Sequence, residues 1–231
     1  MMSFAKTDMG HQCHGACQRL GRHCHDTAFA TVVLRGGYME AGDEGRRTVE
    51  AGHVLIHHAY ESHLDCFSKK GAELLVLPVP TDNGLPLFGT TTDPEGLLRT
   101  ARSSLPDAWH HLTETWSSSE QRHQDWPDLL AECLRQDADL SLRQWAENMG
   151  LRPESVSRGF QRAYGSSPKA FRASSRARLA MQRLCGTRQS FCDIAASLGF
   201  ADQAHMSRAV VTLTGSTPSH WRRSASSSPA S

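Results

Sequence analysis

The spacing of hydrophobic residues changes character along the 231-residue chain. Before about residue 90, apolar residues form short β-prone runs, with turns expected at Gly36-Gly37 and Gly42-Asp43. The runs are Phe29–Leu34, Val54–Ile56 and Leu74–Leu77. Beyond about residue 140, apolar residues recur every three or four positions, as on one face of an α-helix. The pattern predicts an α+β protein, in which a small antiparallel barrel or sandwich precedes an all-helical part.

The helical part contains an internal repeat. Nine positions agree in kind at a constant offset of fifty, and an upstream segment repeats at an offset of forty-nine. A repeat of this length indicates one supersecondary unit used twice. The matching strings are Ser157-Arg158-Gly159-Phe160, Gly165-Ser166-Ser167-Pro168 and Phe171-Arg172 in the first copy, and Ser207-Arg208-Ala209-Val210, Gly215-Ser216-Thr217-Pro218 and Trp221-Arg222 in the second.

Each copy is predicted to be a helix, a turn and a second helix. In the first copy, Ser141 is expected to cap a short helix, Gly150 to end it in a left-handed conformation and Pro153 to begin the next helix. The small residue Ala146 allows the two helices to approach closely. The second copy has the same arrangement around Gly199. Two matches in register favour a tandem helix-turn-helix over an ordinary helical bundle.

Charge supports a polyanionic partner for the repeat. Residues 141–231 contain thirteen Arg or Lys against four Asp or Glu, a net charge of +9, whereas residues 1–140 carry −8. A basic surface on a tandem helical repeat is typical of nucleic-acid binding. The exposed positions lack the aromatic residues that stack on unpaired bases, which favours double-stranded DNA over RNA.

These residues carry a family resemblance. Residues 141–223 resemble the double helix-turn-helix domain of the AraC/XylS family of bacterial transcription regulators. One departure is Val210-Val211-Thr212, where many members have Phe followed by two basic residues. The motifs that carry the resemblance are Trp145-Ala146-x3-Gly150, Ser157-Arg158-Gly159-Phe160, Ile194-Ala195-x3-Gly199-Phe200, Ala201-Asp202-Gln203 and Gly215-Ser216-Thr217-Pro218-x2-Trp221-Arg222.

The resemblance implies two recognition helices that enter successive segments of the DNA major groove. Arginine suits the paired acceptors of guanine and glutamine suits adenine, while other basic side chains hold phosphates without reading sequence. The residues expected to read bases are Glu154, Ser157 and Arg158 in the first helix and Gln203, Ser207 and Arg208 in the second. The residues expected to contact phosphates are Arg143, Arg162, Arg172, Thr217 and Arg222.

Histidines are the chemically distinctive feature of the first part. His23 and His25 alternate on an expected strand, so that both project to one face, and His63 follows a later strand. The spacing resembles that of a cupin, in which these three positions bind a divalent metal. Phe29 and Ala30 occupy the place of the glutamate that completes the metal site in such proteins. Three imidazoles with an open position suit Zn²⁺ or another borderline metal.

Other roles for these residues stay open at this point. The histidines could instead line a pocket for an organic effector or serve a structural role. Cys13-x3-Cys17 could form a second metal or thiol sensor in the Cys/His-rich N-terminal segment. We expect Cys133, Cys185 and Cys192 to be small core residues. Seven cysteines without a secretory signal or paired framework favour a reducing cytoplasm.

The chain is therefore divided into four parts. Residues 1–90 are expected to form a cupin-like sensor domain, and 91–138 a helical linker or dimerisation segment with helices near 95–103, 107–116 and 125–136. Residues 139–223 are the DNA-binding domain, and 224–231 a disordered tail. No run of eighteen apolar residues exists, so no membrane partner is expected.

The function expected from these parts is that of a cytoplasmic transcription regulator, an activator that binds DNA as a homodimer and engages RNA polymerase, and not an enzyme. Its first domain would sense a small molecule or metal. One alternative is a metal-dependent cupin oxygenase or isomerase with an appended DNA-binding domain. Another is a constitutive DNA-binding protein whose first domain only dimerises.

Overall fold

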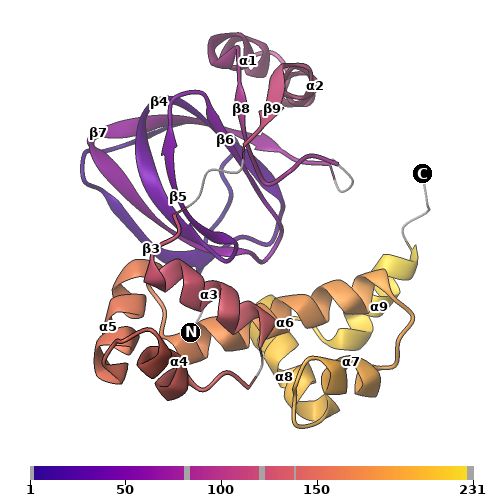
Figure 1. Cartoon of the computed structure of the whole chain (residues 1–231). Coiled ribbons are helices and arrows are strands. Elements are labelled where there is room, and N and C mark those ends of the chain that lie inside the picture. The colour runs from indigo at the N-terminus through magenta and orange to yellow at the C-terminus, as the bar shows by residue number, and fades with distance from the viewer. Residues whose placement is uncertain (1–2, 81–83, 120–122, 138, 228–231) are drawn as a thin grey trace. The chain divides into compact units, whose positions relative to one another are not determined.

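The protein consists of two compact units, Met1–Gln124 and Asp125–Ser231 (Figure 1). The structure is a computed structural model that describes residues 3–80, 84–119, 123–137 and 139–227. The first unit is a curved, mainly antiparallel sheet with two helices, and the second is entirely helical. The expected order, a β part followed by an all-helical tandem helix-turn-helix, is confirmed.

The sheet is built around two long strands. The strands are β1 (Ser3–Phe4), β2 (Gly10–His14), β3 (Arg19–Cys24), β4 (Phe29–Gly42), β5 (Gly45–Glu50), β6 (His53–His57), β7 (Ser62–Pro78), β8 (Phe88–Thr91) and β9 (Trp116–Ser118). The pairing order is β1-β3-β7-β4-β6-β8-β9, with β2 joined to β7 and β5 to β4. Within the described residues, these pairings form an open path and not a closed ring.

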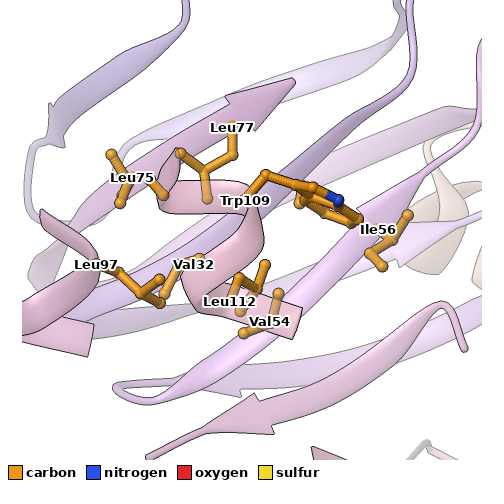
Figure 2. Packing of buried hydrophobic residues seen from close by; sticks show 10 residues of the cluster. Val32, Val54, Ile56, Leu75, Leu77, Leu97, Trp109 and Leu112 are labelled. Carbon is orange, nitrogen blue, oxygen red and sulfur yellow. The ribbon is translucent and has the colours of Figure 1, made fainter. Parts of the chain in front are cut away.

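The two faces of the sheet bury different clusters. Side chains alternate between faces along a strand, so Val54 and Ile56 of β6 lie on one face and Leu55 on the other. The first face packs against α1 (Pro94–Ala101) and α2 (Leu105–Thr115), through residues that include Trp109 and Leu112 (Figure 2). The second face holds Leu55 with Phe67, Tyr38 and their neighbours, and it continues into the histidine pocket described below.

One expected turn is instead a bulge. Gly36-Gly37 lies inside β4, where the register with β7 shifts between Gly36 and Tyr38. Gly36 has φ +69°, and a side chain there would collide with the backbone of Gly71. The glycine pair therefore bends a continuous strand, because two backbones approach too closely for a Cβ. The turn expected at Gly42-Asp43 does occur, between β4 and β5.

The second unit contains seven helices among its described residues. They are α3 (Trp126–Gln136), α4 (Leu142–Asn148), α5 (Pro153–Tyr164), α6 (Pro168–Gly186), α7 (Phe191–Ser197), α8 (Gln203–Thr214) and α9 (Pro218–Ser227). The long helix α6 contacts α5 on one side of the repeat and α7, α8 and α9 on the other. Helices α5 and α6 share an aromatic core in which Phe160 and Tyr164 stack and Phe171 meets both edge-on. Helices α7 and α8 share a core with α6 that includes Ile194 and Val210.

The two copies of the repeat end their helices in the same way. Gly150 and Gly199 have φ of +67° and +68° and form the turns between α4 and α5 and between α7 and α8. Leu151 N–H donates to the Ala146 carbonyl at 2.8 Å, and Phe200 N–H donates to the Ala195 carbonyl at 3.0 Å. The sequence repeat is thus a repeat of backbone hydrogen bonds. Ser141 caps α4 and Pro153 begins α5, as predicted.

The segment 91–138 divides between the two units. Its helices α1 and α2 pack on the sheet, whereas α3 contacts α5 and α6, and the hydroxyl of Tyr164 donates to Asp128 at 2.7 Å. At the end of the chain, residues 224–227 belong to α9, and 228–231 of the expected tail lie outside the described residues. Throughout the described residues, no helix combines the length and apolar composition needed to cross a bilayer.

Candidate functional sites: two recognition helices and a histidine pocket

The second helix of the first repeat, α5, separates buried and exposed residues cleanly. Val156 and Phe160 are fully buried, while Glu154, Ser157 and Arg158 are exposed. The alternation follows from a helical period of 3.6, which places residues three and four apart on one face. The three side chains expected to read bases therefore lie together on the accessible face of α5.

Helix α8 presents the corresponding face in the second repeat. Asp202 caps the helix by accepting from the His205 N–H at 2.6 Å. Gln203 and Arg208 are exposed and Ser207 is half-buried. Val211 is 39% exposed at a position that offers DNA no charge. The outward face of α8 is therefore less basic than that of α5, which also exposes Arg162.

The five residues expected to contact phosphates differ in their surroundings. Arg162 is exposed, and Arg143 forms an exposed ion pair with Glu147 at 3.1 Å. Arg172 donates to the Leu140 carbonyl at 2.7 Å. The Thr217 hydroxyl accepts from the His220 N–H at 3.3 Å, at the start of α9.

Arg222 is held by its own domain. It donates to the carbonyls of Leu184 and Gln189 at 3.0 and 2.8 Å and lies over the ring of Phe191. Arg222, like Arg172, therefore joins helices of its own domain. Phosphate contact by these residues stays a prediction.

A thiol contacts the recognition helix of the second repeat. Cys192 Sγ donates to the side-chain oxygen of Gln203 at 3.2 Å. Both Cys192 and Cys185 are exposed, so the expectation that they are core residues is wrong. Each lies on the side of its helix opposite the apolar stripe, and this side faces solvent. The amide nitrogen of Gln203 and the second lone pair of its oxygen stay available to a base.

Three predicted histidines come together in the first unit. His23 and His63 are direct partners in the pairing of β3 with β7, and His25 follows β3. One ligand atom from each of the three lies within 4.8 Å of the others. His25 and His63 are buried, and His23 is half-buried. The sequence-predicted set is therefore brought together in one place.

Three further residues of this pocket escaped the sequence argument. His57 lies 4.6 Å from His63 between ring centroids, and its Nε2 is 3.5 Å from Glu40. His63 Nε2 is 3.7 Å from Asp65. Strand alternation was the available signal, because Asp65 shares a face with His63, and His57 shares one with Leu55. Long-range pairing of β4 with β7 then places Glu40 opposite Asp65.

Burial keeps the imidazoles of the pocket neutral. It lowers the pKa of His25 to about 4 and that of His57 to about 3, and it also lowers the pKa of His23 and His63. The same burial raises the pKa of Asp65 to about 7. Neutral imidazole is the form that binds metals and accepts hydrogen bonds.

The helical unit matches a known family. Residues 145–224 match the family model described as "Helix-turn-helix domain". Together with the duplicated helix pairs α4–α5 and α7–α8, this match defines a tandem helix-turn-helix DNA-binding domain. The domain is of the AraC type, and the chain is a DNA-binding transcription regulator. DNA is therefore the partner of the helical unit.

Three solved structures to which the chain is similar have low sequence identity to it. The C-terminal domain of AraT, a response regulator from Geobacillus stearothermophilus, is 23% identical over 45% of this chain and 88% of its own, with a TM-score of 0.41. Unsaturated fatty acid-bound ToxT from Vibrio cholerae is 9% identical over 94% of this chain and 96% of its own, with a TM-score of 0.43. The DNA-binding domain of AdpA in complex with a target DNA is 19% identical over 44% of this chain and 93% of its own, with a TM-score of 0.40. The comparison with curated proteins yields no match.

Proposed function

We propose that the regulator reads DNA sequence through the exposed faces of α5 and α8. The observation that carries this proposal is the Ser-Arg pair repeated at equivalent places, Ser157-Arg158 and Ser207-Arg208, beside Glu154 and Gln203. Each arginine is long enough to reach the acceptors of a guanine in the major groove, and Gln203 suits adenine. Arg143, Arg162, Arg172, Thr217 and Arg222 are proposed to position the domain on phosphates.

The first unit is proposed to be a non-enzymatic sensor domain. Its pocket contains His23, His25 and His63 and would receive the effector, whether a small molecule or a metal. An effector changes transcription only if it binds two arrangements of the protein with different affinity. We further propose a cytoplasmic homodimer that activates transcription through RNA polymerase, since these partners fit a sequence-specific regulator.

The test is selection of DNA sites by the purified full-length chain, followed by quantitative binding of single-base variants of the selected site. Arg158→Ala and Arg208→Ala should each lose discrimination at one base pair, by about 1–3 kcal/mol. Arg135→Ala, in α3 outside the repeat, is the matched control and should leave the base preferences unchanged. If Arg158→Ala and Arg208→Ala weaken DNA binding equally on all sequences, the two arginines contact phosphates instead of bases.

The same assay separates the competing functions. An identical footprint with and without every effector tested would favour a constitutive DNA-binding protein. Turnover of a small molecule without sequence-specific binding would favour an enzyme.

A further inference from the structure

The histidine pocket carries an inference about the class of its ligand, which rests on the proposed sensor function. The pocket is small, with a cavity volume of about 160 Å³. Sites for drug-sized organic ligands span about 300–1,000 Å³. A volume of 160 Å³ corresponds to about five water molecules at ~30 Å³ each. The size therefore favours an ion with a few attached atoms over a large organic effector.

The imidazoles are held with nitrogen lone pairs available. His23 Nδ1 lies 2.8 Å from the Gly21 carbonyl, and a carbonyl only accepts, so Nδ1 carries the proton and Nε2 carries the lone pair. His25 Nδ1 is held by the Thr7 hydroxyl at 2.9 Å. Such outer hydrogen bonds orient the histidine ligands of metal sites.

Two buried polar atoms of the cluster lack a hydrogen-bond partner among the described residues. His63 Nδ1 is buried and has no hydrogen-bond partner among the described residues, and the same holds for Asp65 Oδ1. A buried polar atom without a partner destabilises the folded state. An electrophile bound at His63 would remove this destabilising effect. His63 is 4% exposed and lies against His23, with 4.3 Å between their ring centroids.

Two carboxyl groups lie beside the imidazoles of the cluster. Glu40 and Asp65 are buried and line the cavity, and their nearest imidazoles are those of His57 and His63. Carboxyl groups next to ligating histidines orient the imidazole rings of metal sites. The surroundings of the cluster therefore suit the outer shell of a metal site.

We propose that the ligand is a divalent transition-metal ion of the borderline class, such as Zn²⁺, bound by one nitrogen each from His23, His25 and His63. Tetrahedral ligands at 2.0–2.1 Å from Zn²⁺ lie about 3.3 Å apart, so nitrogens within 4.8 Å need to move inward by roughly 1 Å. His57 pairs with Glu40 outside this set. The cavity that the three histidines line could hold a fourth ligand such as water.

The experiment measures metal binding by the full-length chain. Chelator-treated protein is titrated with Zn²⁺, and with Co²⁺ whose visible absorption reports tetrahedral coordination. One ion per chain with a nitrogen-rich Co²⁺ spectrum is expected. A strong near-ultraviolet thiolate band would place cysteine among the ligands and overturn the proposal, as would the absence of stoichiometric metal. This measurement needs no variant, so it does not depend on a substituted domain folding.

Substitutions then locate the ion. His23→Gln, His25→Gln and His63→Gln should each weaken binding by at least about 100-fold, more than loss of an outer-shell partner does. His57→Gln should have a smaller effect, and His110→Gln, on the exposed side of α2, should have none. Equal affinity of His63→Gln and the wild type would refute the assignment. DNA-site selection with the same protein separates the proposed metal site from the proposed DNA-binding function. If the protein binds specific DNA sites but no metal, only the metal proposal fails.

Discussion

Gly159 in α5 tests how the helical unit is assembled. A glycine inside an exposed helix normally costs about 1 kcal/mol relative to alanine. At Gly159, however, an added Cβ would lie 2.5 Å from Cζ2 and 2.7 Å from Cη2 of Trp126 in α3. Carbon atoms pack at about 3.5–4.0 Å, so the indole would have to move by roughly 1 Å. Gly159→Ala therefore introduces a clash between α3 and α5.

The magnitude follows from two opposing effects. The alanine stabilises the helix by about 1 kcal/mol, and overpacking costs about 1–3 kcal/mol. We expect Gly159→Ala to lower the free energy of unfolding by about 1 kcal/mol. Gly186→Ala is the matched control, because Gly186 ends α6 and has no atom within 4 Å of its Cβ position. That substitution should raise stability by up to about 1 kcal/mol.

The assay is urea unfolding followed by tryptophan fluorescence, for a double-mutant cycle with Trp126→Ala. Without the indole, Gly159→Ala should become stabilising, with a coupling energy of about 1–3 kcal/mol. Stabilisation by Gly159→Ala in the presence of Trp126 would refute the reasoning. It would mean that α3 does not pack on α5 in solution and that the helical unit begins later than Asp125.

Three further predictions concern DNA binding and acid stability. Arg162→Ala should reduce the slope of the logarithm of the DNA-binding constant against the logarithm of the salt concentration by about 0.9. Stability should not change, since Arg162 is exposed. An unchanged slope would contradict its phosphate role. Arg222→Ala should instead lower the free energy of unfolding by about 1–3 kcal/mol in a urea titration, because it removes two hydrogen bonds and a ring contact. Unchanged stability would contradict a structural role for Arg222. In metal-depleted protein, His25 and His57 should make the first unit less stable as the pH falls from 6.5 towards 4. Their pKa values in the folded protein are about 4 and 3, so the unfolded chain takes up protons at a higher pH than the folded protein does. Asp65, with a pKa of about 7, and Glu40 act in the opposite direction, so the histidine contribution is measured by comparison with His57→Gln. The variant should lose less stability than the wild type between pH 6.5 and 4, and an equal loss would contradict the lowered pKa of His57.

Local patterns predicted the helices of both units closely. The expected helices near 95–103, 107–116 and 125–136 occur as α1, α2 and α3, with ends shifted by at most two residues. Gly150 adopts the left-handed conformation that its place after an apolar stripe indicated. These features depend on residues within one or two turns of each other, which is the range that a sequence pattern reports. Gly36 was misjudged because its conformation depends on Gly71, a residue on another strand.

The sequence by itself determined the tandem helix-turn-helix and its outward residues, since both rest on short-range periodicity. It also indicated three histidines of one site, through a spacing that resembles that of a cupin. Only the tertiary structure decided which helix belongs to which unit and what surrounds the histidines. The pairing of β4 with β7 brings Glu40 to Asp65, and the docking of α3 explains Gly159. Such contacts join residues far apart in the chain, and their formation depends on the burial of a shared core, which no local spacing records.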